Sequence, residues 1–212
     1  MIAHHHIQQA RQALDTLDAQ AGRLQRWGER LARLLSSGHR LLVAADGGSA
    51  AQAQHWVTQL VGCYQGDRPP FSAIALHSDG CTSSAILDGY GPAEVVARQV
   101  RAHGRPRDVL VLLSATASTQ VAPEAPHLPV GEPAGTPANG PLLTAARTGR
   151  DKGLTVWAIT GMPAGPLGTV ADEVVVIDAV TTAAAREAQL VALHLVCEVV
   201  DASLALDGRW SA

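Results

Sequence analysis

Five short apolar runs, separated by stretches of helical character, constrain the fold of this chain more than any other feature. Each run is five to seven residues long and carries few charges. Such runs are typical of strands that are buried on both faces of a parallel sheet. They lie at residues 40–45, 72–77, 108–113, 154–160 and 173–177. The pattern predicts an α/β protein with a doubly wound parallel sheet.

Helical periodicity fills the segments around these runs. Leucines and Trp27 recur at three- and four-residue steps over residues 5–37, which predicts a pair of N-terminal helices. Further helices are expected at residues 50–61, 92–102 and 183–206. The last of these is expected to be a long C-terminal helix with apolar residues along one side.

Length and composition exclude several classes of protein. The 212 residues fit one domain, 1–212, and the formal net charge of −3 argues against a nucleic-acid partner. No apolar run approaches the roughly 20 residues of a membrane helix, and no basic-plus-apolar leader precedes the first helix, so no membrane contact is expected. Three cysteines are too few for a disulfide scaffold, which favours a cytoplasmic location.

A proline-rich segment at residues 120–140 interrupts the alternation. Six of the twelve prolines lie between residues 123 and 141, and the segment contains no lysine or arginine. Proline blocks helices, so the segment is predicted to be an inserted loop. It divides an α/β core at residues 39–119 and 141–206, which follows the helices of residues 1–38. The insert is either a lid or partner contact, or a neutral surface insertion.

Two segments that follow predicted strands carry glycine and hydroxyl side chains. The first is Asp46-Gly47-Gly48-Ser49, and the second is the run from Ser114 to Thr119. Ligands of open α/β sheets bind beyond the carboxyl ends of the strands, where backbone N–H groups and a helix N-terminus attract anions. Neither segment matches the P-loop or GxGxxG pattern. The alternative for the first segment is an ordinary turn with a helix N-cap.

Three stretches of the sequence are similar to one known family. They are LLVAADGGSAAQAQHWVTQLVGCY, DRPPFSAIALHSD and RPRDVLVLLSATAST. They resemble the sugar isomerase (SIS) domain, and in particular the sedoheptulose 7-phosphate (phosphoheptose) isomerase group and its replication-initiator-associating adaptor relatives. The similarity extends over residues 8–206 apart from the insert. It implies a five-stranded parallel sheet flanked by helices, a homotetramer with sites at subunit interfaces, and a phosphorylated sugar as ligand.

The resemblance also implies a set of phosphate- and sugar-binding residues. They are Gly48, Ser49, His55, Ser114, Thr116, Thr119 and Arg186. Two departures from the family pattern lie beside these residues. Asp46 stands where asparagine is usual, and Ala117 replaces a glycine, so that a β-carbon lies where backbone amides approach the phosphate.

The catalytic positions of the family are less well preserved. The histidine of the final helix is present as His194, but the glutamate that acts as base corresponds to Gln59. A carboxamide cannot accept a proton at neutral pH, and loss of a positioned base costs about 10²–10⁴-fold in rate. Gly89 and Ala183 stand where the family has aspartates. Weak or altered activity is therefore expected.

No metal or cofactor is expected. Some family members bind zinc through two histidines, the glutamate and the glutamine; here only His55 and His194 would remain, fewer ligands than zinc takes. Each histidine alone is interpreted more readily as a hydrogen-bonded interface or core residue than as a catalyst. Arg186, at the family's glutamine position, either pairs with an anion or caps an exposed first turn of the last helix.

Three functions remain open. The first is a phosphosugar-binding protein with little catalysis. The second is an active aldose-ketose isomerase in which Asp46, Asp88 or His194 takes over as base. The third is a non-catalytic adaptor that binds a protein partner through residues 120–140.

Overall fold

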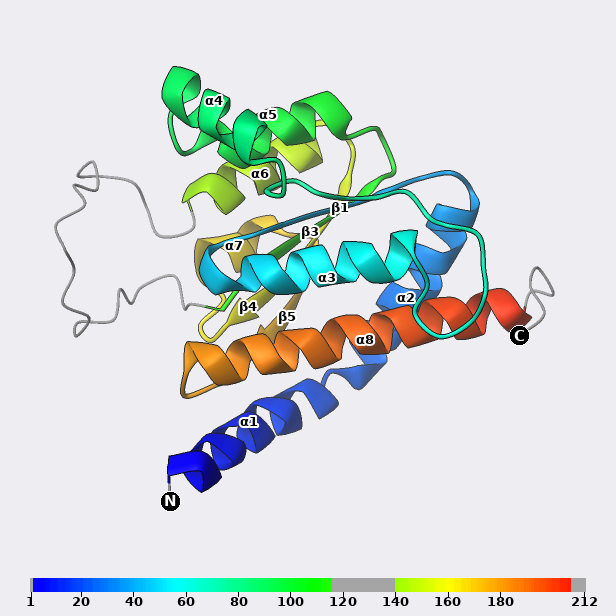
Figure 1. Cartoon of the computed structure of the whole chain (residues 1–212), viewed down its shortest axis with the longest axis vertical. Helices are drawn as coiled ribbons and strands as arrows, with labels where there is room; N and C mark the ends of the chain where they lie inside the picture. Colours follow the sequence, from blue (N-terminus) through cyan, green and yellow to red (C-terminus); the bar gives the residue numbers. More distant parts are fainter. Residues whose placement is uncertain (1, 116–139, 207–212) are drawn as a thin grey trace, which may run out of the picture.

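The computed structural model describes residues 2–115 and 140–206, and one parallel sheet of five strands lies at its centre (Figure 1). The strand order is β2-β1-β3-β4-β5. The strands are β1 (Leu41–Ala45), β2 (Ala73–Ala75), β3 (Val109–Ser114), β4 (Thr155–Gly161) and β5 (Glu173–Ile177). This is the predicted sheet. The order reverses between β1 and β3, which makes their carboxyl ends the switch point where ligands of such sheets bind.

Helices cover both faces of the sheet, as predicted. One face is covered by α1 (Ile2–Asp18), α2 (Ala21–Ser36), α3 (Ala50–Val61) and α8 (Thr182–Leu206). The other is covered by α5 (Glu94–His103), α6 (Gly140–Asp151) and α7 (Gly165–Val170), with α4 (Gly80–Tyr90) beside α5. The expected N-terminal helical pair is therefore α1 and α2.

The burial of β3 explains why its sequence is continuously apolar rather than alternating. Val111 and Leu113 pack into the core under α2 and α8, whereas Leu110 and Leu112 pack into the second core under α5 and α6. All six residues of β3 are buried. A central parallel strand has no solvent-facing side, so both of its faces must be apolar.

A stacked pair of tryptophans joins the N-terminal helices to the sheet. The rings of Trp27 on α2 and Trp157 on β4 lie 4.5 Å apart and nearly parallel. Both are fully buried, and the Trp27 indole donates to the Glu173 carboxylate at 3.0 Å. The helical pair is thus part of the main core and not an appendage to it.

The closing helix α8 corrects one expectation from the sequence. Within residues 2–115 and 140–206, it is the one helix that is long and apolar enough to cross a membrane by length and composition. The expectation that no apolar stretch reaches this length is wrong for α8. Its buried residues belong to the main core, and the helix packs against α1, α2 and α3. That is the position of a core helix.

Several elements were not predicted from the sequence. These are helices α4, α6 and α7. Helix α4 buries only Ile86 and begins at an N-cap, because Asp79 accepts from the amides of Cys81 and Thr82. Strand β2 is three residues long, half the length expected. Its short pairing with β1 suits an edge strand.

The proline-rich segment falls largely outside the described residues. Gly140, placed in the insert by sequence, is buried and begins α6, so the boundary moves by one residue. Residues 120–139 lie outside the described part of the chain. The lid, partner-contact and adaptor readings therefore stay predictions.

Candidate active site

The carboxyl ends of β1 and β3 meet through a short hydrogen bond. The chain leaves β1 at Asp46, turns through Gly47 with a φ of +48°, and enters α3 through a single 3-10 turn. Ser114, the last residue of β3, donates its hydroxyl proton to the Asp46 carboxylate at 2.7 Å. Burial raises the pKa of Asp46, while the bond from Ser114 and the charge of Arg186 act in the opposite direction. The switch point therefore carries a half-buried carboxylate bordered by a cation.

The guanidinium of Arg186 lies flat against the backbone of Gly48. A β-carbon at Gly48 would stand 2.5 Å from Arg186 Cζ and 2.8 Å from its Nε, closer than real atoms approach. Glycine is thus required for this contact. The Nε atom of Arg186 is buried and has no hydrogen-bond partner within the described chain. Arg186 is therefore partly buried and leaves one guanidinium donor unused within the described chain; whether it pairs with an anion stays a prediction.

Ser49 adds a second unused donor to this end of the site. Its side chain is fully buried, and its Oγ has no hydrogen-bond partner among the described residues. Buried hydroxyls are normally hydrogen-bonded, and an exception points to a missing ligand, water or subunit. Ser49 precedes α3, whose N-terminus carries partial positive charge. The group most compatible with these donors is an anion.

Helices α3 and α8 run side by side (Figure 1), and they bring the two predicted histidines together. The Nε2 atoms of His55 and His194 lie 2.8 Å apart, and the Gln59 amide nitrogen lies 3.0 Å from His55 Nε2. Hydrogen bonds thus join the three side chains, and the tautomers of the two imidazoles decide which ring nitrogen donates.

The surroundings of His194 keep its imidazole neutral. Burial lowers the pKa of His194, and the adjacent His55 lowers it further. The ring of Tyr64 lies 5.5 Å from that of His194 and covers part of it. A neutral imidazole with a free lone pair can act as a proton acceptor.

The residues at this site do not fit the zinc centre that the family resemblance would imply. Within the described ranges, no group of three or more histidine, cysteine, aspartate or glutamate side chains is placed to hold a metal ion. In the cluster on α3 and α8, the described imidazoles are those of His55 and His194. Gln59 turns its amide nitrogen toward them, and a guanidinium, which has no lone pair to offer, stands at Arg186.

Three polar side chains near the site were missed by sequence reasoning. His77, just beyond β2, donates from Nε2 to the Ala50 carbonyl at 3.0 Å, while its Nδ1 is buried without a partner in the described chain. Gln52 and Gln189 also hold buried polar atoms that lack partners there. His77 gave no sequence signal beyond its place at the end of an apolar run.

The structure thus unites most of the residues singled out by sequence. His55, Gln59 and His194 form one cluster, and Gly48, Ser49 and Arg186 form another at the N-terminal ends of the same two helices. Thr116 and Thr119 lie outside the described residues. Their assignments stay predictions.

We expect the free energy of unfolding to fall as the pH drops below about 6.5. Burial lowers the pKa of His77 as well as that of His194. Below their ordinary value of 6.5, the unfolded chain binds protons that the folded chain does not yet bind, so protonation favours unfolding down to the lowered pKa values. Urea titrations at about pH 7.5 and about pH 5.5 measure the loss.

A double variant isolates the two histidines. In His77→Gln/His194→Gln the difference in stability between the two pH values should shrink, because the variant lacks both neutral imidazoles. The raised pKa of Asp46 has the opposite effect on the free energy of unfolding, since the folded chain binds that proton more readily than the unfolded chain. Asp46 is present in both proteins, so its effect cancels in the comparison. An undiminished pH dependence in the variant would contradict the assignment.

Fold and site together define the class of protein. A family model for the SIS domain matches residues 5–125, more than half of the chain, and this range includes β1, Ser49, His55 and Gln59. The chain belongs to the SIS-domain family.

Within that family, the chain is homologous to phosphoheptose isomerases. It is 47% identical to the phosphoheptose isomerase of Streptomyces coelicolor over 199 residues, 94% of this chain and 78% of that protein. It is 34% identical to the enzyme of that name from a Bradyrhizobium strain over 207 residues, 97% and 93% of the two chains. The solved phosphoheptose isomerase structure from Neisseria gonorrhoeae superposes with a TM-score of 0.78 at 24% identity, over 95% and 97% of the two chains. At that identity the superposition shows the shared fold.

Proposed function

We propose that this chain binds a phosphorylated sugar at the carboxyl ends of β1 and β3, and that its isomerase activity is weak. The observation that carries the proposal is the pair of unused buried donors there, Ser49 Oγ and Arg186 Nε. Both suit a phosphate or a sugar oxyanion. The relatives named phosphoheptose isomerase support sedoheptulose 7-phosphate as the first ligand to test.

The geometry supports distinct roles for the two clusters. Ser49 and the start of α3 would hold the phosphate, and Arg186 would pair with a sugar or phosphate oxygen. The sugar carbons would then extend from there toward His194. Isomerisation moves a proton between adjacent carbons through an enediol, and the neutral imidazole of His194 would be the base for it.

Gln59 explains why turnover should be slow. It occupies the position from which a carboxylate would remove the proton, but it donates to His55 instead. His194 then acts without a second base, and the expected loss is about 10²–10⁴-fold. An active isomerase of ordinary rate is the alternative; the neutral, partly covered His194 is the one observation that favours it.

A thermal-shift titration with sedoheptulose 7-phosphate tests the binding. A ligand at about 100 times its Kd stabilises the folded state by about 2.7 kcal/mol, so the melting temperature should rise by several degrees. Ser49→Ala should reduce the shift, whereas Thr58→Ala, an exposed hydroxyl on α3, should not. No shift at millimolar ligand in the wild-type chain would overturn the proposal.

A further inference from the structure

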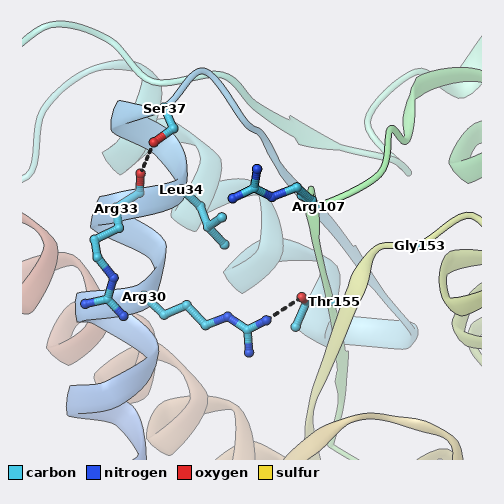
Figure 2. Close-up of a pocket in the computed structure, with 7 residues that line it drawn as sticks. All are labelled: Arg30, Arg33, Leu34, Ser37, Arg107, Gly153 and Thr155. Atoms are coloured by element: carbon cyan, nitrogen blue, oxygen red, sulfur yellow. Dashed lines mark hydrogen bonds between the residues drawn. The ribbon is translucent and has the colours of Figure 1, made fainter.

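A pocket near the amino ends of the strands, opposite the candidate active site, is lined by three arginines. It lies beside the amino ends of β3 and β4, and its volume is about 440 Å³. The lining residues come from the end of α2 and from the turns before β3 and β4, and they are Arg30, Arg33, Leu34, Ser37, Arg107, Gly153 and Thr155. In Figure 2 the side chains of Arg30 and Arg107 reach toward the space around Leu34 from two sides. The pocket is therefore distinct from the site at the carboxyl ends of the strands.

The positive charge of this pocket is poorly compensated. Its lining contains no carboxylate in the described chain. Arg30 donates to Thr155 Oγ1 at 2.8 Å and lies 3.8 Å from the Glu173 carboxylate. Arg33 and Arg107 have no ion pair among the described residues. Since the chain as a whole is acidic at −3, this concentration of cations is a local feature.

The nearest acidic residue along the chain is already engaged elsewhere. Asp108, directly after Arg107, is almost fully buried. Its carboxylate accepts from the backbone amides of Arg40 and Arg105 at 2.9 and 3.0 Å, and His39 lies 3.7 Å away. These bonds hold the loop before β3. They leave the Arg107 guanidinium without that counter-charge.

The backbone of Arg107 adds an independent observation. Its φ is +73°, and among the described residues it is the one non-glycine residue with a positive φ. This conformation is sterically unfavourable for a residue with a β-carbon and is relaxed for glycine or asparagine. It is fixed by the bond from the Arg107 amide to the Gly153 carbonyl at 2.9 Å. Strained residues of this kind are concentrated at functional sites.

We propose that this pocket binds a small phosphorylated molecule, separately from the phosphosugar site. Planar guanidinium groups pair with phosphate oxygens through two hydrogen bonds each. Thr155 Oγ1 accepts from Arg30, which leaves its own proton for a phosphate oxygen. The volume leaves room for an organic part beside the phosphate, and Leu34 gives that part an apolar surface. The binding is independent of the proposed isomerase chemistry, because this pocket lies at the amino ends of the strands and the phosphosugar site lies at their carboxyl ends.

Calorimetric titration of the full chain with pyrophosphate tests the proposal. Arg107→Asn removes the guanidinium and suits the left-handed backbone, so the fold should be kept, and a melting temperature without ligand that is no lower than that of the wild type checks this. The variant should bind pyrophosphate about tenfold more weakly, because a hydrogen bond to a charged group is worth that order of affinity. Arg26→Gln, an exposed arginine on the same helix as Arg30, should bind like the wild type.

Each other outcome overturns the proposal. Equal losses in Arg107→Asn and Arg26→Gln would show a general effect of charge. A loss in Ser49→Ala with none in Arg107→Asn would place pyrophosphate at the carboxyl ends of the strands instead. Absence of binding at millimolar pyrophosphate would leave the pocket without phosphate affinity.

Discussion

Replacing Gln59 with glutamate is expected to raise the rate of sedoheptulose 7-phosphate isomerisation by about 10²-fold or more. The Gln59 amide nitrogen lies 3.0 Å from His55 Nε2, so a carboxylate at the same place would accept from the histidine pair instead of donating to it. It would supply the second base that the site lacks, and a positioned base contributes about 10²–10⁴-fold. A coupled assay of aldose formation measures the gain.

Two further variants give this prediction its controls. Gln54→Glu adds the same charge to an exposed position on α3, away from His55, and should leave the rate unchanged. His194→Ala in the Gln59→Glu background should remove most of the gain, because His194 supplies the other proton-transfer group. If Gln59→Glu stays as slow as the wild type while still binding the sugar phosphate, the missing base is not what limits turnover. The absent aspartates at Gly89 and Ala183 would then be the next positions to restore.

Replacing Arg68 with methionine is expected to destabilise the chain by about 3 kcal/mol or more. Arg68 is 8% exposed and joins the loop after α3 to α8. Its guanidinium donates to three backbone carbonyls and to the Asp201 carboxylate, the last at 2.8 Å. Methionine keeps much of the volume but removes these donors. The Leu60 carbonyl keeps the Phe71 amide and Asp201 keeps the Gln65 amide, yet breaking a buried ion pair from one side costs about 3–5 kcal/mol.

Denaturant titration with a matched control measures this loss. Arg26→Met changes an exposed arginine and should stay within about 0.5 kcal/mol of the wild type. Adding Asp201→Leu to Arg68→Met should recover part of the stability, because the orphaned carboxylate is then removed. A loss below about 1 kcal/mol in Arg68→Met would show that solvent already satisfies these acceptors.

Most of the fold could be predicted from the sequence, because buried parallel strands and amphipathic helices leave strong local patterns. The five apolar runs located every strand, and the leucine spacing located α1 and α2. Helices α4 and α7 were missed because each buries a single side chain, Ile86 and Leu167, so neither shows an apolar stripe.

The site could be predicted only in part, because its contacts join residues that are far apart in the chain. The family resemblance indicated both His55 and His194 as site residues, and the structure places their Nε2 atoms 2.8 Å apart. Sequence spacing gave no sign that Arg186 packs on Gly48, nor that His77 bonds to the first turn of α3. The pocket around Arg107 also depends on packing: α2 and the turns before β3 and β4 are brought together only by the folded sheet.

The central claim is that the chain binds a phosphorylated sugar while Gln59 keeps its turnover low. Measuring binding and turnover of sedoheptulose 7-phosphate on one wild-type preparation, by calorimetry and by the coupled assay, tests both halves together. We expect saturable binding that Ser49→Ala weakens, with a turnover about 10²-fold or more below that of a phosphoheptose isomerase that carries the glutamate. Turnover equal to that enzyme's, or no binding at millimolar ligand, would contradict it.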